Sequence, residues 1–415
     1  MVMRVANNNN AQGSGRLVAL AMRWVVALIF LGLAYAAGLS AIVNVTRAAS
    51  PQTALSVSAN DALAVVARAD ADFTAAAAKG KAIDVSARAA QSLRGEPVNP
   101  RAVRLLGFAA DAKGDNKNAM RFARLADRLS RRDIPSQMWL LENAVERNDV
   151  RAVLARYDII IRSSYTLRDL LYPKLALALS DNDVRDGFVP YIRSNPAWLS
   201  NFVSIAIGAS NPDALSYAIR QAGGLPKTDA YKKLETSLLG ALFATQKFAE
   251  GRAFFETLDG SDRALLTTTA FTDSTLDSRF APVNWALEAG SNTGATAEKA
   301  GKSWAMRAFA LSNSTGLAAS KYLFLPPGHY RFRSIQTIVT PGTNARASWV
   351  LRCMSSPAQP VIYQYDMIRT GRAAIPASEF AVSSDCAVQR LELNLAGGDD
   401  SSGLELRLAS VTIGT

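Results

Sequence analysis

The longest uncharged stretch of the sequence lies near its N-terminus. It runs from Trp24 to Val45 and is bracketed by Arg23 and Arg47. A helix over residues 24–45 would be about 33 Å long, enough to cross the roughly 30 Å hydrocarbon core of a bilayer. The pattern therefore predicts one membrane-spanning helix.

Basic residues set the expected orientation of that helix. Three arginines precede it, whereas Arg47 alone follows it closely. Because positively charged flanks stay in the cytoplasm, we expect residues 1–23 to form a cytoplasmic tail, disordered over residues 1–15, and the remainder to be exported. The alternative is a signal peptide cleaved at Ala34-Tyr35-Ala36, which exports the same part of the chain.

Alanine-rich helical segments follow, and the turns between them recur. The spacing is 34 residues in four of five steps and 30 residues in the other. The turns are Lys79-Gly80-Lys81, Lys113-Gly114-Asp115, Arg147-Asn148-Asp149, Asp181-Asn182-Asp183, Asn211-Pro212-Asp213 and Lys247. A fixed period of this size is the signature of stacked helical hairpins, so we expect six hairpins over residues 57–260.

Residues 105–133 show the repeat most clearly. Its small and aromatic positions are Leu106-Gly107, Gly114-Asp115, Ala119, Phe122 and Ala126, and a looser copy has Leu239-Gly240, Ala249, Phe254 and Phe255. The pattern resembles the tetratricopeptide repeat, in which short side chains let paired helices approach and a ring fills the space beside them. The resemblance implies an all-α solenoid that binds a protein partner.

The second helix of that copy is strongly basic. Five arginines recur on it or directly after it at intervals that place them on one face: Arg121, Arg124, Arg128, Arg131 and Arg132. Such a face is either solvated surface or a contact for an anionic glycan, lipid headgroup or acidic partner.

After about residue 260 the pattern changes to short alternating strands. We expect strands at 283–288, 303–311, 330–338, 348–354, 361–367, 379–382, 388–395 and 404–413. These predict an all-β jelly roll or sandwich over residues 263–415, and the chain as a whole is multidomain. The period of two puts Trp349, Leu351 and Cys353 on one face and Leu391, Leu393 and Leu395 on another.

The cysteine and histidine counts limit the chemistry. Two cysteines, Cys353 and Cys386, cannot form a four-thiolate site, and one histidine, His329, excludes a two-histidine metal site. We expect no metal, no cofactor and no catalytic residue. Because exported proteins meet an oxidising environment, we predict a Cys353–Cys386 disulfide, with two buried free thiols as the alternative.

Exposed aromatic rings in a sandwich can bind sugars, because a flat ring covers the apolar face of a pyranose. Tyr330, Tyr363 and Tyr365 are the best candidates, since a tyrosine can keep its hydroxyl in water. Packing into the core is the alternative for each of them.

The net charge of +11 does not indicate a nucleic-acid partner, and we expect none. Four of the excess positive charges belong to the first 49 residues, where a membrane explains them. The segment Ala300-Gly301-Lys302-Ser303 does not complete a phosphate-binding loop, because Thr296 stands where the motif needs glycine.

Three segments of the C-terminal region, 280–285, 325–331 and 349–353, together with Cys386, carry a second resemblance. They are similar to the carbohydrate-binding-module-like domain of membrane-anchored proteins found with exopolysaccharide systems of Gram-negative bacteria. The resemblance implies a periplasmic, non-catalytic adaptor anchored in the inner membrane, with a sandwich that contacts polysaccharide. An envelope scaffold without sugar binding and a carboxylate-based glycan-modifying enzyme are the alternatives.

Overall fold

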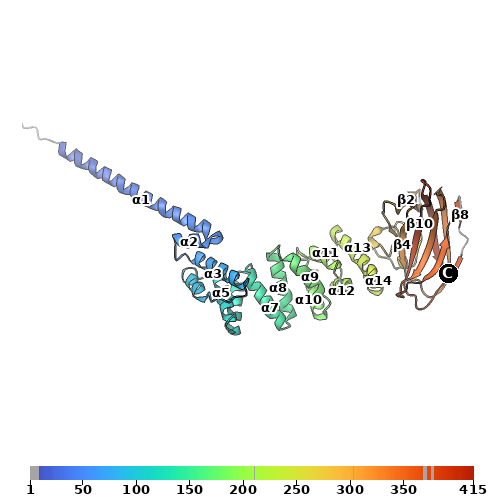
Figure 1. Cartoon of the computed structure of the whole chain (residues 1–415), viewed down its shortest axis with the longest axis horizontal. Helices are drawn as coiled ribbons and strands as arrows, with labels where there is room; N and C mark the ends of the chain where they lie inside the picture. The colour runs from blue at the N-terminus through green and yellow to red at the C-terminus, as the bar shows by residue number, and fades with distance from the viewer. Residues whose placement is uncertain (1–8, 210, 302, 368–371, 375–377) are drawn as a thin grey trace, which may run out of the picture. The chain divides into compact units, whose positions relative to one another are not determined.

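The structure is a computed structural model that describes residues 9–209, 211–301, 303–367, 372–374 and 378–415. Along the chain, an apolar helix is followed by further helices and then by a β-sandwich (Figure 1). This confirms the predicted fold class. The chain forms two compact units, Met1–Leu167 and Arg168–Thr415.

Fourteen α-helices lie in the described part of the chain. They are α1 (Asn9–Ala49), α2 (Pro51–Val57), α3 (Ala62–Ala77), α4 (Ser86–Gly95), α5 (Pro100–Asp111), α6 (Asn116–Leu129), α7 (Ile134–Glu146), α8 (Val150–Ser163), α9 (Arg168–Ala178), α10 (Asn182–Ser194), α11 (Leu199–Ile207), α12 (Pro212–Ala222), α13 (Asp229–Ala244) and α14 (Phe248–Phe255).

Helix α1 contains the predicted span. Its section Ala19–Ala49 is long and apolar enough to cross a membrane, a property that signal sequences share. The helix already begins at Asn9, so residues 9–15 are helical and not disordered, while residues 1–8 lie outside the described part. Helical structure extends beyond the apolar run because nothing in residues 9–23 breaks a helix as proline would.

The C-terminal end of α1 is joined directly to the helical region. Val43 is buried against Ala54 of α2 and Ala64 of α3. Ser58 and Asp61 line a pocket of about 440 Å³ together with Ser40. Because these polar groups belong in water or headgroups, a membrane crossed by α1 would have to end near Ser40, earlier than Val45. The section from residue 19 to residue 39 still measures about 31 Å.

Aspartates in the turns begin the second helices of the pairs. Asp115 accepts a hydrogen bond from the backbone nitrogen of Asn118 (3.1 Å), and Asp149 accepts one from Ala152 (3.0 Å). Such N-caps satisfy backbone donors that the first helical turn leaves free. The regular spacing thus reflects regular capping. In the turn before α10 the cap is Asp181, two residues before the aspartate that gave the 34-residue step.

The small residues of the clearest repeat permit a close approach of α5 and α6. A Cβ atom added at Gly107 would lie 3.3 Å from the Cβ atom of Phe122 and 3.6 Å from the carbonyl oxygen of Ala119. Ala119 and Ala126 are buried between the helices. The close packing of α5 against α6 is therefore the packing that the small residues of this repeat predict. In the second unit, α9 packs against α11 and α10 against α12.

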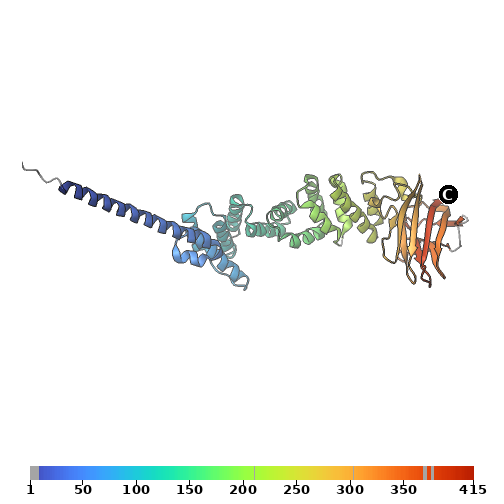
Figure 2. The ribbon, with the colours of Figure 1, turned by 90° about the horizontal axis from the view of Figure 1, so that it is seen from above.

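Eleven strands form the sandwich within the described residues, and Figure 2 shows the sandwich from a second direction. They are β1 (Ala286–Leu287), β2 (Thr293–Ala300), β3 (Ser303–Ala310), β4 (Thr315–Leu323), β5 (Gly328–Pro341), β6 (Arg346–Cys353), β7 (Val361–Asp366), β8 (Arg372–Ala374), β9 (Ser378–Val382), β10 (Gln389–Ala396) and β11 (Leu404–Gly414). The first sheet has the order β1-β4-β10-β6-β7. The second has the order β2-β3-β11-β5-β8, with β9 also paired to β5. All pairs are antiparallel.

The eight predicted strands are present, although the first is reduced to β1. Strands β2, β4 and β8 were not predicted. Strands β2 and β4 are rich in alanine, glycine and lysine, which are uncommon in strands, so the sequence gives them little signal.

One prediction about the strand faces is wrong. In the register between β6 and β10, Leu393 lies opposite Trp349 and Leu391 lies opposite Leu351. Directly opposed residues share a face, so both rows point into one core instead of onto two faces. Trp285, Trp349 and Phe332 are buried there, and full burial of each large side chain contributes about 1.5–3 kcal/mol.

The two cysteines form the predicted disulfide. Cys353 is the last residue of β6 and Cys386 lies in the loop that leads into β10, with Cα atoms 5.6 Å apart. The bond therefore ties that loop to the neighbouring strand of the same sheet.

A buried lysine attaches the segment before the sandwich to β4. The Lys321 side chain is 0% exposed. Its Nζ atom donates hydrogen bonds to the carbonyl oxygens of Leu265 (2.9 Å) and Val283. These two carbonyls belong to the segment that connects α14 to β1, so Lys321 holds this segment against the first sheet.

Lys321 should make the stability of the second unit depend on pH. Burial lowers the pKa of its ammonium group to about 7, whereas an unfolded chain restores a value of about 10.4. Between these values the unfolded chain binds more protons than the folded one. The free energy of unfolding should therefore rise as the pH increases from about 7 towards 10. Urea denaturation over this pH range measures the slope.

Two variants test the origin of that slope. Lys321→Met should flatten it, because the titrating group is gone. Lys299→Met should keep it, since Lys299 is a half-exposed lysine of β2. Equal slopes in the wild type and in Lys321→Met would show that another group is responsible.

Candidate functional site

The three tyrosines expected to bind sugar do not form an exposed platform. Tyr330 and Tyr363 are buried, and their rings lie 5.7 and 5.1 Å from that of Phe380. The Tyr330 hydroxyl donates to the carbonyl oxygen of Pro326 (2.8 Å), and the Tyr363 hydroxyl bonds with the hydroxyl of Ser378. Tyr365 is partly buried against the same core.

The prediction that the hydroxyls of Tyr330 and Tyr363 stay in water is therefore wrong. The physical reason is the strand register, which a single strand does not reveal. Tyr363 lies opposite Leu351 and Tyr365 opposite Trp349, so both rings point towards the core.

The five predicted arginines of the α6 region are all exposed. In the described part of the chain, none of these five forms an ion pair or a side-chain hydrogen bond. Asp127, the acidic residue of α6, pairs instead with Arg156 of α8 (2.9 Å) and Gln137 of α7 (2.8 Å). The basic face of α6 is thus left without a counter-charge.

A cleft of about 580 Å³ lies between α13 and the outward face of the first sheet. Gly240 and Phe243 line it from α13, and Ser320, Tyr322 and Arg390 line it from the strands. Figure 1 shows α13 and α14 beside β4. The cleft combines a sheet floor with a helical wall.

Arg390 lies in the floor of the cleft and belongs to a group of charged side chains on neighbouring strands, whose other members, Arg352 and Glu392, lie beside the cleft and do not line it. Arg390 of β10 lies opposite Tyr322 of β4 and Arg352 of β6, so the three share the outward face. Glu392 is 9% exposed. Its carboxylate forms ion pairs with Arg352 and Arg390, each at 3.2 Å. We call Arg352, Arg390 and Glu392 the floor triad.

Arg390 is held from several sides but keeps one free donor. Its Nη2 atom donates weakly to the hydroxyl of Ser320 (3.4 Å), and its guanidinium lies 5.6 Å from the centre of the Tyr322 ring. Its Nε atom is buried and has no hydrogen-bond partner among the described residues. A buried donor without a partner is costly, so it favours a ligand oxygen at this place.

Tyr322 lines the cleft where the sheet meets the helical wall, and its ring does not form a flat, open platform. Its ring lies 4.7 Å from that of Phe243 and 5.6 Å from that of Phe248. Burial raises the pKa of its hydroxyl. With both ring faces crowded, the cleft is suited to hydrogen bonding of hydroxyl groups more than to stacking of a pyranose.

The sequence holds a signal for the floor triad that the search for aromatic rings missed. From residue 390 to residue 395 the chain alternates between polar residues and leucines, which indicates a strand with one polar face. Strand β4 could not be added from sequence, so the cleft itself remained hidden. Within the described residues, no group of three or more His, Cys, Asp or Glu side chains could hold a metal ion.

Neither a protein-family model nor a curated protein matches the sequence. Among solved structures, the C-terminal family 22 carbohydrate-binding module of a Clostridium thermocellum xylanase is 12% identical. The match covers 32% of this chain and 85% of that one, with a TM-score of 0.23. A family 61 carbohydrate-binding module in complex with β-1,4-galactotriose is 10% identical over 31% and 87% of the two chains, with a TM-score of 0.23.

The enzymatically active domain of tailspike protein 4 of bacteriophage CBA120 is 12% identical, with a TM-score of 0.24. That match covers 32% of this chain and spans only 19% of the tailspike chain. The sandwich of the present chain is established by its own strand pairing, and these distant likenesses add no argument about its ligand.

Proposed function

We propose that this chain is a non-catalytic adaptor anchored in the inner membrane, with its bulk in the periplasm. Its helical repeats bind a protein partner, and its sandwich contacts a polysaccharide during exopolysaccharide assembly or export. Apolar α1, the helix pairs and the sandwich follow one another in a single chain. Such tethering raises the local concentration of both binding regions for membrane partners.

The cleft over the first sheet carries the glycan part of the proposal. Arg390 brings a guanidinium donor and Glu288 a carboxylate acceptor to the lining of the cleft, and sugar hydroxyl groups both donate and accept hydrogen bonds. The free Nε atom of Arg390 adds a donor that the protein itself does not satisfy. We therefore place the glycan contact at this cleft and not at the three tyrosines.

Replacing Arg390 by glutamine should weaken glycan binding by about tenfold or more, because a hydrogen bond to a charged group is lost. Full-length protein in detergent is tested on a glycan array and with the exopolysaccharide of the source organism. Arg407→Gln is the matched control. Arg407 lies on β11 in the second sheet, where its Nε atom pairs with Glu298 (3.4 Å).

The alternatives predict different outcomes of the same experiment. Failure of the wild type to retain any polysaccharide at low salt would favour a protein scaffold without sugar binding. Shortening of the polysaccharide by purified protein, abolished in Glu288→Gln, would favour an enzyme, since Glu288 is the carboxylate that lines the cleft. Equal loss in Arg390→Gln and Arg407→Gln would show general charge attraction in place of a site.

A further inference from the structure

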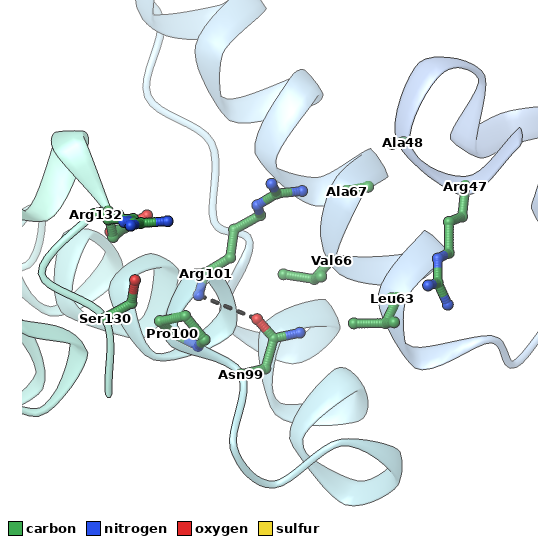
Figure 3. A pocket seen from close by; sticks show the side chains of 11 residues that line it. Arg47, Ala48, Leu63, Val66, Ala67, Asn99, Pro100, Arg101, Ser130 and Arg132 are labelled. Carbon is green, nitrogen blue, oxygen red and sulfur yellow. Dashed lines mark hydrogen bonds between the residues drawn. The ribbon is translucent and has the colours of Figure 1, made fainter. Parts of the chain in front are cut away.

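A second pocket lies where α1 ends. Its volume is about 410 Å³, and it is lined by residues from α1, α3, the start of α5 and the turn before α7. Figure 3 shows Arg47 and Arg132 on opposite sides of it, with Arg101 and Asn99 between them. All these residues belong to the first compact unit. We call it the anchor pocket.

The anchor pocket has an excess of positive charge. Arg47 and Arg132 form no ion pair with another described residue, and Arg101 approaches Asp70 only to 3.8 Å. Asp133, which also lines the pocket, is bound by Arg104 and by the hydroxyl of Ser136. Arg47 and Arg132 therefore remain available to an anion, and the long ion pair of Arg101 leaves part of its guanidinium to contribute.

A buried amide in the anchor pocket also lacks a partner. Asn99 is 5% exposed. Its Oδ1 atom caps α5 by accepting hydrogen bonds from the backbone nitrogens of Arg101 (3.1 Å) and Ala102 (3.3 Å). This fixes the amide orientation, and the Nδ2 atom is left buried without an acceptor. An anionic oxygen in the pocket would satisfy it.

One wall of the anchor pocket is apolar. Leu63, Val66 and Ala67 of α3 form it. A free phosphate ion has no apolar group that could contact this wall. A glycerophospholipid has one, because its phosphate is bonded to a glycerol backbone that carries apolar chains.

We propose that the anchor pocket binds the phosphate of an anionic glycerophospholipid at the membrane surface. This inference rests on α1 as the anchor of the proposed function. The Cα atom of Arg47 lies about 10 Å along the helix beyond Ser40, and the headgroup layer is about 5–7 Å thick. A flexible arginine side chain spans the remaining distance. The bound lipid would fix the first helix pairs against the bilayer.

Calorimetric titration of full-length protein in zwitterionic detergent tests the proposal. The probes are dihexanoyl-phosphatidylglycerol, dihexanoyl-phosphatidylcholine and inorganic phosphate. We expect the phosphatidylglycerol to bind at least about tenfold more tightly than either of the others. Arg132→Gln should weaken that binding by about tenfold. Asn99→Asp should weaken it too, while its carboxylate keeps the cap of α5.

Arg151→Gln is the matched control, since Arg151 is an exposed arginine of α8 outside the pocket. It should leave the affinity unchanged. Equal binding of both lipids, equal binding of inorganic phosphate and phosphatidylglycerol, no binding at all, or an equal loss in Arg151→Gln would each overturn the proposal. Membrane anchoring itself is tested separately by alkaline extraction of cell membranes, and glycan binding by the array.

Discussion

Replacement of Arg104 by methionine is expected to lower the free energy of unfolding of the first unit by about 3–5 kcal/mol. Arg104 is 3% exposed and binds two carboxylates, Asp70 of α3 (2.5 Å) and Asp133 at the start of α7. Without the guanidinium, two largely shielded carboxylates would lie close together with no cation between them. Urea denaturation followed by far-ultraviolet circular dichroism measures the loss.

Two further variants separate the ion triad from general effects of the substitution. Arg101→Met removes a neighbouring arginine whose side chain is 49% exposed, and it should cost less than about 0.5 kcal/mol. Combining Arg104→Met with Asp70→Asn and Asp133→Asn should restore most of the stability, because no uncompensated charge remains. A loss below about 1 kcal/mol in Arg104→Met alone would contradict this account.

The helical region was predictable because its main signals are short-range. The N-caps, the turns and the small residues on paired helices all lie within one repeat of the sequence. Even the Arg104 triad leaves a trace, since Asp70 precedes Arg104 by 34 residues, the length of one repeat. The sequence alone does not show that Arg104, Asp70 and Asp133 meet in a shielded position, because this depends on how neighbouring helix pairs stack.

The sandwich was predictable as a fold but not as a site. Alternation revealed most strands, whereas the direction of each face depends on register between strands far apart in the sequence. For this reason Tyr363 and Tyr365 were candidates for sugar binding, with packing into the core as the alternative; the register favours the core, because they oppose Leu351 and Trp349. The cleft was overlooked because β4, which completes it, has almost no strand signal.

The anchor pocket illustrates the same limit at a larger scale. Its lining comes from four segments spread between Arg47 and Asp133. Arg132 was singled out in the sequence for its charge, whereas Asn99 was not. Their combination becomes visible only when the end of α1 is placed beside α3 and α5. Its role as a lipid site stays a proposal.

Loss of the Cys353–Cys386 bond is expected to lower the free energy of unfolding of the sandwich by about 3–4 kcal/mol. The bond closes a loop of 33 residues, and opening it gives the unfolded chain more conformational entropy. The loop includes β7, β8 and β9, so this is the segment whose unfolded ensemble expands when the bond is absent. Urea denaturation with and without reductant, followed by tryptophan fluorescence, measures the change.

The double variant Cys353→Ala/Cys386→Ala provides the control, since it should match the reduced wild type and no longer respond to reductant. Alkylation of free thiols in protein taken directly from cells extends the test to the location of the sandwich. Protected cysteines are expected if this part of the chain is exported, because the cytoplasm keeps thiols reduced. Fully alkylated cysteines, together with equal stability of oxidised and reduced protein, would contradict both the stabilising role of the bond and the periplasmic placement on which the glycan proposal depends.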